Sequence, residues 1–351
     1  MSKISYVEEA IYIKFLRLGI IYTLSIIFTL LSLVQLIKEY IFNGSNIFTK
    51  NIPARPKCLD DYKSNFLHLK NGVKLHYVME GDKGKELMLF IHGFPEFWYS
   101  WRRQLDYFKD NYCCVAIDMR GYGESDKPNG IDEYKIENLI EDIENVILQL
   151  GYQKAIVVGH DWGAIVSWMF AIFYPEMVSK LVIMDVPHPK AGEIIYRSNF
   201  KQMAKSWYMY FFQFPVVPEI FLSLSNFQPL RNMFKGKKGG LCNRDNLSNE
   251  DINSYVYTFG SQPNGFAAPI NYYRSFLQRW NLIKYPKEPV KPETLIIFGE
   301  KDFFVITENA YQSQKYCSKS KVVIVKNASH WVQQDAPEEV NKAIENFLCS
   351  S

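Results

Sequence analysis

The sequence predicts an α/β fold in which a mainly parallel β-sheet carries helices on both faces. Three observations lead to this prediction. Short apolar runs alternate along the chain with longer helical stretches, which is typical of a parallel sheet. An aromatic and irregular segment interrupts the alternation over residues 187–289, after which it resumes. An uncharged apolar run, residues 18–37, precedes the globular part.

The composition is that of an ordinary globular protein. The chain has 351 residues, of which 48% are apolar and 22% charged, and this length allows one large α/β domain or two smaller ones. The formal net charge of +3 gives no reason to expect a nucleic-acid partner. The six cysteines form neither a C-x-x-C pair nor a tandem His/Cys spacing, so we expect no zinc site and no disulfide framework.

Residues 18–37 would form a helix about 30 Å long, which matches the hydrocarbon core of a bilayer. A cleavable signal peptide would have a shorter apolar region followed by small residues, and the flank at Lys38 does not supply them. We therefore predict a single transmembrane helix over residues 18–37 after an N-terminal flank of residues 1–17. A removed signal or a buried helix is the alternative. Basic residues are nearly balanced on the two sides, so the orientation stays open.

The next segment, residues 38–57, is rich in Asn, Pro and basic residues and is predicted to be a stalk. The globular part begins at residue 58. Residues 67–81 alternate between apolar and polar side chains on both sides of Asn71-Gly72, which is the strongest short-range signal of a β-hairpin.

Short apolar runs that suit strands buried on both faces follow the hairpin. They occupy residues 87–91, 113–117, 155–158 and 181–184, with helical stretches over residues 133–150 and 164–174. Strands at residues 294–298 and 322–325 and a closing helix at residues 337–348 come after the interruption.

This order predicts one core domain in two parts, residues 58–186 and 290–351, with an inserted, mostly helical cap or lid over residues 187–289. Aromatic side chains of such an insertion can form the apolar wall of a pocket. A helical subdomain without a pocket is the alternative.

Residues 159–163, GHDWG, have the form G-x-Nu-x-G between a predicted strand and a predicted helix. Small flanking residues let a strand reverse sharply into a helix and expose the central side chain, so Asp161 is the candidate nucleophile. An aspartate in front of a helix is also a common N-cap. Chain order favours the nucleophile: Asp302 follows the first strand after the insertion, and His330 follows the last strand. Nucleophile, acid and histidine occur in this order in α/β-hydrolases.

Asp185 is a rival for the acid, because it ends the strand before the insertion. We favour Asp302, and we expect Glu300 beside it to face solvent. The oxyanion donors should be the backbone amides of Trp162, which follows the nucleophile, and of Phe94, which follows the third strand. We interpret His92 as a side chain that stabilises the turn, not as a second base.

An aspartate at this position indicates the chemistry. A serine that attacked a saturated carbon would form an ether, which water cannot cleave. A carboxylate forms an ester, which a water activated by His330 can hydrolyse while Asp302 orients the imidazole. Asp161 therefore predicts an alkylating substrate such as an epoxide or an alkyl halide.

Several motifs together resemble the epoxide hydrolases of the α/β-hydrolase superfamily. They are HGFPEFWYSWR (residues 92–102), DMRGYG (118–123), GHDWGA (159–164), GEKD (299–302) and SHW (329–331). With the N-terminal anchor, the chain looks most similar to the membrane-bound animal branch, epoxide hydrolases 3 and 4, and the resemblance covers nearly the whole chain.

The resemblance implies that two lid tyrosines bind the epoxide oxygen and donate a proton as the ring opens. They map onto Tyr208 and Tyr273, and Tyr210 competes with Tyr208 within the same aromatic cluster. Trp162, Tyr210 and Phe94 are the expected substrate-binding side chains.

The expected function is therefore hydrolysis of lipophilic epoxides to vicinal diols, in lipid epoxide metabolism or detoxification. A haloalkane dehalogenase, with the Trp162 indole on the halide, and a ligand receptor that no longer turns over are the alternatives. The expected partners are a small lipophilic epoxide, water and a lipid bilayer of endoplasmic reticulum or microsomal type. We expect no metal, no organic cofactor and no obligate protein partner.

Overall fold

The computed structural model describes residues 3–262 and 265–349, so the ends of the predicted flank and of the second core part lie outside the described residues. Within this part of the chain, eight strands form one sheet in the order β1-β2-β4-β3-β5-β6-β7-β8. The first two pairings are antiparallel and all others are parallel. The strands are β1 (Ser64–His68), β2 (Lys74–Glu80), β3 (Leu87–Ile91), β4 (Cys113–Ile117), β5 (Ala155–His160), β6 (Val178–Met184), β7 (Glu293–Gly299) and β8 (Ser320–Val325).

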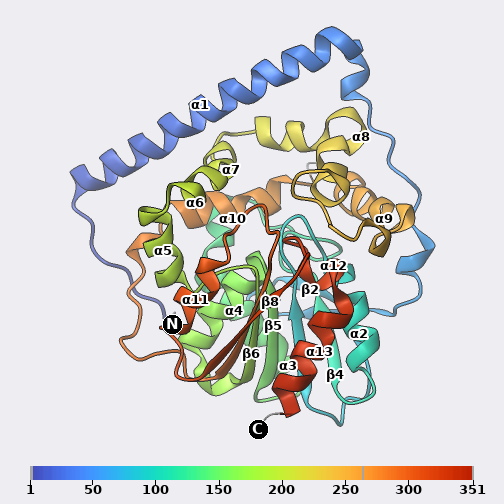
Figure 1. Ribbon diagram of the computed structural model, residues 1–351, viewed down its shortest axis with the longest axis vertical. Helices are drawn as coiled ribbons and strands as arrows, with labels where there is room; N and C mark the ends of the chain where they lie inside the picture. Colours follow the sequence, from blue (N-terminus) through green and yellow to red (C-terminus); the bar gives the residue numbers. More distant parts are fainter. Residues whose placement is uncertain (1–2, 263–264, 350–351) are drawn as a thin grey trace.

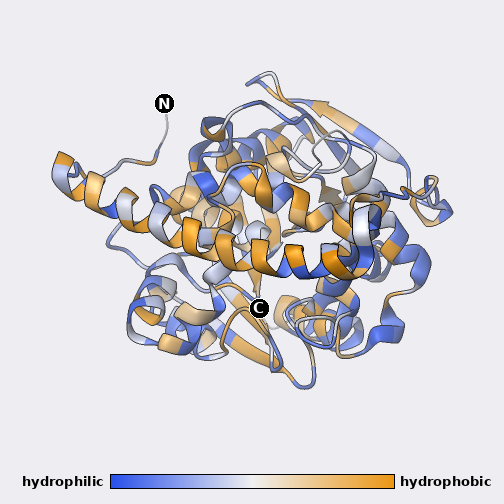
Figure 2. Ribbon diagram, turned by 90° about the horizontal axis from the view of Figure 1, so that it is seen from above, coloured by the Kyte–Doolittle hydropathy of each residue, from blue (hydrophilic) through white to orange (hydrophobic). Residues whose placement is uncertain are grey.

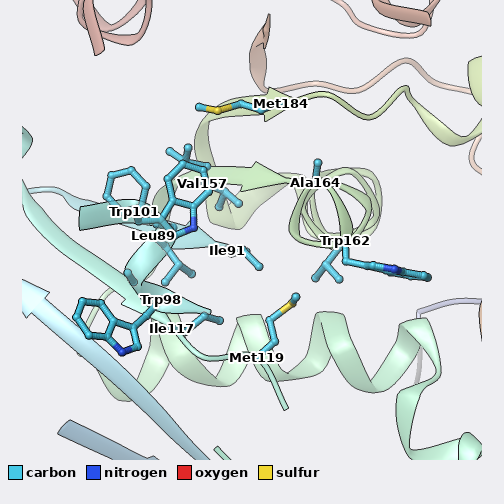
Figure 3. Close-up of a cluster of buried hydrophobic side chains, with 14 of the residues drawn as sticks. Leu89, Ile91, Trp98, Trp101, Ile117, Met119, Val157, Trp162, Ala164 and Met184 are labelled. Carbon is cyan, nitrogen blue, oxygen red and sulfur yellow. The ribbon is translucent and has the colours of Figure 1, made fainter. Parts of the chain in front are cut away.

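The centre of the sheet is covered on both faces. Every residue of β3, β4 and β5 is buried, although successive side chains of a strand point to opposite faces. Figure 3 shows part of this core, in which Leu89 of β3 and Val157 of β5 lie beside Trp101. The predicted mainly parallel α/β sheet is therefore confirmed.

The predicted hairpin is present as β1 and β2, with Leu67 opposite Leu75. Its connection is longer than a two-residue turn. Asn71 accepts a hydrogen bond from the backbone of Val73 at 3.2 Å, and Gly72 has φ +87°, a conformation that favours glycine.

Helices connect the parallel strands of the core or follow the last strand. They are α2 (Arg102–Phe108), α3 (Ile136–Gln149), α4 (Trp162–Phe173), α11 (Glu308–Gln314), α12 (Val332–Asp335) and α13 (Pro337–Cys349). The predicted gap between the strand at 155–158 and the helix at 164–174 is nearly absent, because β5 runs on to His160 and α4 begins at Trp162. Asp161 alone makes the turn.

The close packing at this turn depends on Gly163. A Cβ atom on Gly163 would lie 1.9 Å from the backbone oxygen of Ile91, at the end of β3. The missing side chain therefore lets the first turn of α4 lie against the carboxyl ends of the central strands.

The segment between β6 and β7 is helical and lies over the carboxyl ends of the strands (Figure 1). Its described part contains α5 (Pro189–Ser198), α6 (Phe200–Lys205), α7 (Trp207–Phe211), α8 (Val217–Lys235), α9 (Asn249–Gly260) and α10 (Ala267–Leu277). A kink divides α8, where Ser225, Asn226 and Phe227 have positive φ. We call this segment the cap.

Helix α1 (Ile11–Asn43) is longer at both ends than the apolar run that predicts it. Together with a short 3-10 helix, η1 (Gly44–Phe48), it is long and apolar enough to cross a membrane by length and composition, and an 18-residue stretch of it has a mean hydropathy of 2.3. The helix lies across the cap beside α7 (Figure 1), and Figure 2 shows from above that most of its residues are hydrophobic. The first residues of the predicted stalk therefore belong to the helix.

We expect Gly163→Ala to destabilise the protein by about 3 kcal/mol, the upper part of the usual range for overpacking, because backbone atoms cannot move aside as a side chain can. Urea-induced unfolding of the purified protein measures the change. Gly84→Ala is the control, because the nearest atom to its Cβ would lie at 3.5 Å, and it should change the free energy of unfolding by less than about 0.5 kcal/mol. Equal unfolding midpoints for the two variants would contradict the packing argument.

Candidate active site

Asp161 occupies the sharp turn between β5 and α4, at the carboxyl edge of the sheet. Its φ is +48° and its ψ is −119°, a backbone conformation that costs about 1–3 kcal/mol and that is concentrated at functional sites. A Cβ atom on Gly93 would lie 2.4 Å from the Cβ of Asp161, so only glycine allows the loop after β3 to approach this closely.

Two groups hold the Asp161 carboxylate. The backbone N–H of Phe94 donates to Oδ1 at 2.7 Å, and Nε2 of His330 lies 3.5 Å from Oδ2. Trp162 is the first residue of α4, where backbone N–H groups have no acceptor within the helix. Burial favours the neutral acid, but the hydrogen bond and charge of His330 outweigh it and lower the pKa of Asp161 below its ordinary value.

His330 and Asp302 form the second half of the site. Nδ1 of His330 lies 2.7 Å from Oδ2 of Asp302, while Oδ1 of Asp302 accepts from the backbone N–H groups of Phe304 and Val305. Burial opposes protonation of His330, but the charge of Asp302 and the hydrogen bonds with Asp161 and Asp302 raise its pKa well above the ordinary value. The structure thus brings all three predicted triad residues together.

Asp185, the rival acid, does not hold the histidine in this arrangement. Its Oδ1 accepts from the backbone N–H of Gly299 at 2.7 Å, and its Oδ2 lies 4.0 Å from Nε2 of His160. Burial and the charge of Asp302 raise the pKa of Asp185 well above its ordinary value, which favours the neutral acid.

Glu96 and His160 form a buried pair that the sequence analysis did not single out. Oε2 of Glu96 lies 2.7 Å from Nδ1 of His160, and Nε2 of His160 lies 2.8 Å from the backbone oxygen of His330. Gln333 and Gln334 donate to the other oxygen of Glu96. The signal was available, because both residues lie inside the two motifs that carry the site, HGFPE and GHDWG.

His160, Asp185 and His330 each have one potential metal-ligand atom, and these atoms lie within 4.8 Å of one another. Both ring nitrogens of His160 and Nδ1 of His330 already have hydrogen-bond partners. The cluster therefore fits a hydrogen-bond network behind the nucleophile.

His92 and Glu300 lie where the sequence suggests. Nδ1 of His92 is 2.8 Å from the backbone oxygen of Gly93, and Nε2 accepts from the backbone N–H of Met119. His92 thus links the loop after β3 to the loop after β4. Glu300 is exposed and accepts from the backbone N–H of Asn327 at 3.2 Å.

Two cavities meet at the Asp161 carboxylate, and Tyr208, Tyr273 and Phe304 line both of them. The first, of about 240 Å³, extends under α8 past Phe212 and Trp331. The second, of about 200 Å³, extends between α5 and α10. A larger hollow of about 900 Å³ lies elsewhere, around Lys284 and Tyr285, and includes none of the candidate residues.

The tyrosines differ in their surroundings. Burial, together with the charge of Asp161, raises the pKa of Tyr208 and Tyr273 above the ordinary value, so both stay protonated acids. Their rings meet edge to face at 5.9 Å. Tyr210 lines only the second cavity, and its hydroxyl lies 2.6 Å from that of Tyr196. The substrate-binding candidates Phe94 and Trp162 each pack their ring against Tyr273.

Comparison with known proteins agrees with this geometry. Residues 86–337 match the family described as the alpha/beta hydrolase fold. The chain is 40% identical over 324 residues to "Epoxide hydrolase 2" of Caenorhabditis elegans, covering 92% of this chain and 90% of the relative. It is 42% identical over 305 residues to "Epoxide hydrolase 4" of Homo sapiens, covering 84% and 83%.

A similar solved structure is that of the Bacillus megaterium epoxide hydrolase in complex with an inhibitor. It is 36% identical, with a TM-score of 0.74, covering 82% of this chain and 100% of that one. The resemblance that the motifs suggested is therefore confirmed. Fold, sequence and structural relatives agree, and the chain belongs to the epoxide hydrolases of the α/β-hydrolase fold family.

Proposed function

We propose that this protein hydrolyses lipophilic epoxides to vicinal diols through a covalent ester on Asp161. One observation carries the proposal: an ionised carboxylate at the turn lies between a backbone N–H and an imidazole and faces cavities lined by two protonated tyrosines. Relatives over most of the chain are named epoxide hydrolases, which supports the same activity.

In the first step, a carboxylate oxygen of Asp161 attacks a ring carbon of the epoxide and the bond from that carbon to the ring oxygen breaks. The ring oxygen leaves as an alkoxide, which takes a proton from Tyr208 or Tyr273. Because burial keeps these hydroxyls protonated, they are available as acids at neutral pH. The product of the step is an alkyl ester of Asp161.

Formation of the ester prepares the second step. Esterification removes the negative charge of Asp161 and its hydrogen bond with His330, both of which help to raise the pKa of His330. The imidazole then becomes a better base, with Asp302 still holding Nδ1. It takes a proton from water, which attacks the ester carbonyl, and the N–H groups of Phe94 and Trp162 stabilise the resulting oxyanion. The oxyanion then collapses, the bond from the carbonyl carbon to the substrate oxygen breaks, and that oxygen takes the proton from His330 and leaves as the second hydroxyl of the diol. The proton left on the Asp161 carboxyl group restores the tyrosine hydroxyl.

The two tyrosines favour this activity over dehalogenation. A departing halide needs no proton, whereas an epoxide oxygen does, and two buried tyrosine hydroxyls beside the nucleophile suit the latter. A competent acid, base and nucleophile around one cavity also favour turnover over a binding role.

We further propose that α1 attaches the enzyme to a membrane of endoplasmic reticulum or microsomal type. Its length and apolar surface support this. Such a location suits lipophilic epoxides, in lipid epoxide metabolism or detoxification.

A single turnover of excess enzyme with a lipophilic epoxide in oxygen-18 water tests the proposed mechanism. We expect the label in the Asp161 carboxylate and not in the first diol, because water attacks the ester carbonyl and the diol oxygen comes from the protein. Mass spectrometry of the diol and of the Asp161 peptide measures both. Label in the first diol would mean direct attack by water.

His330→Gln provides the complementary variant, because it should form the ester but fail to hydrolyse it. The Asp161 peptide should then gain the mass of the epoxide. Glu300→Gln is the matched control, since this carboxylate is exposed, and it should turn over like the wild type.

Tyr208→Phe and Tyr273→Phe should each lower kcat/KM by about 10- to 100-fold, because the remaining tyrosine still donates, and the double variant by about 1,000-fold or more. Steady-state diol formation measures the effect. Tyr311→Phe is the control, because that side chain is exposed and lines neither cavity, and its kcat/KM should stay close to that of the wild type. Equal effects of all three variants would contradict the assignment.

Acidification should slow ester hydrolysis before it slows ester formation. Ester formation needs ionised Asp161, whose pKa is lowered, and protonated tyrosines, whose pKa is raised. Ester hydrolysis needs neutral His330. The charge of Asp302 raises the pKa of His330, so acidification protonates this imidazole more readily. Rapid-quench measurement across pH should show the fraction of enzyme present as ester rising as the pH falls. A fraction that falls with acidification would contradict the roles.

A further inference from the structure

The two ends of α1 contact the same globular domain. From this geometry we propose that α1 lies in the plane of a membrane surface, with both of its ends on the side of the hydrolase domain and the cap turned toward the lipid. A transmembrane crossing, which hydropathy predicts, would place the two ends on opposite sides.

The segment before α1 is bound to the body of the protein. The backbone N–H of Val7 donates to the oxygen of Leu282 at 2.7 Å, and the backbone N–H of Lys284 donates to the oxygen of Ser5 at 2.8 Å. The Tyr6 hydroxyl donates to Glu137 of α3 at 2.6 Å. These contacts form a short antiparallel bridge at the exit from the cap, and Figure 1 shows the chain rising from there to α1.

The segment after α1 is bound as well. Ile47 is 1% exposed, and the kink of α8 holds the chain that follows. There the backbone N–H of Asn226 donates to the oxygen of Thr49 at 3.0 Å, and the Asn226 side chain accepts from the backbone N–H of Asn51 at 3.0 Å.

A helix that crosses a bilayer separates its ends by a hydrocarbon core of about 30 Å. The segment before α1 could then not form backbone hydrogen bonds with residues 282–284 of the domain that follows α1. Because it does so here, the whole helix, about 50 Å long, lies along one side of the domain.

The polarity of α1 supports a lipid partner for its outer face. Its buried residues are Ile21, Ser25, Thr29 and Ser32, so hydroxyl side chains face the protein. Its outer face is apolar, and contiguous exposed apolar surface of this kind marks an interaction site. Its exposed large side chains include Ile20, Tyr22, Ile26, Ile27, Leu30, Leu31, Val34 and Ile37. An apolar helix face that lies on a membrane surface is buried in the acyl region below the headgroups.

The cap adds exposed apolar side chains in the neighbouring helices α6, α7 and α8, at Phe200, Met203, Trp207 and Ile220. Phe28 of α1 packs against Trp207 at 5.8 Å and against Tyr210 at 6.4 Å between ring centroids. Trp207 lines the first cavity and Tyr210 the second. The membrane-facing helix therefore contacts a wall of each cavity.

Protease digestion of sealed microsomes that contain the full-length protein with one epitope tag at each end tests the topology. We expect both tags to be digested together or protected together. Digestion of one tag alone would overturn the proposal. The same membranes are sedimented at neutral pH, and recovery of the protein in the supernatant would overturn it too.

A disulfide cross-link reports on the same contact. Tyr6 and Ile283 are antiparallel bridge partners, and the Cα separation in such pairs, about 4.5–5.5 Å, lies in the range that a disulfide spans. The double variant Tyr6→Cys, Ile283→Cys should cross-link in native membranes and keep epoxide hydrolysis. Neither single variant should cross-link. Failure to cross-link in membranes, with activity retained, would overturn the proposal.

Flotation with phosphatidylcholine vesicles tests the outer face. Leu30→Glu should lower the fraction of protein that floats severalfold. The matched control is Leu148→Glu, an exposed leucine near the C-terminal end of α3, at the edge of the sheet opposite the cap, which should leave flotation unchanged. Equal flotation of both variants would overturn the assigned lipid face.

Discussion

The reversal of the chain at Asp161 is the constraint on which the active site depends. One residue in a strained conformation joins a fully buried strand to a helix, so the carboxylate can only project over the edge of the sheet. The packing of Gly163 against β3 and of Gly93 against Asp161 removes the room for any looser turn. The strain is stored because the burial of β5 and α4 on both sides holds the turn in place.

Around this turn one imidazole lies close to several carboxyl groups. His330 faces Asp161 and Asp302, and Asp185 lies behind it close to His160. Backbone N–H groups donate to all three carboxyl groups, but burial and the charge of Asp302 raise the pKa of Asp185 well above its ordinary value. Glu96 and His160, with two glutamine amides, form buried hydrogen bonds that hold the backbone of the histidine loop.

Much of this arrangement could be predicted from the sequence, because strands that are buried on both faces leave an unambiguous apolar signal. The bounds of β3 and β4 follow from their apolar runs. The meeting of Asp161, Asp302 and His330 follows from motifs at strand ends. Glu96 and His160 lie inside the recognised motifs, but their pairing depends on how distant segments pack, and so does the division of the pocket into two cavities. A linear pattern does not show such packing. The position of α1 was equally hidden, since hydropathy reports how apolar a helix is and not where its ends are held.

The bridge between Tyr6 and Ile283 also bears on how the cap moves. The cap is joined to the core by two covalent connections, and the N-terminal segment adds a third tie beside one of them. Because residues 226 and 282–284, which hold the two flanks of α1, belong to the cap, a hinge-like swing of the cap would carry α1 with it and break the hydrogen bond between Tyr6 and Glu137 of the core. Exchange of substrate and product with the cap in place, through rotamer changes of the aromatic side chains in the cavity walls, requires neither.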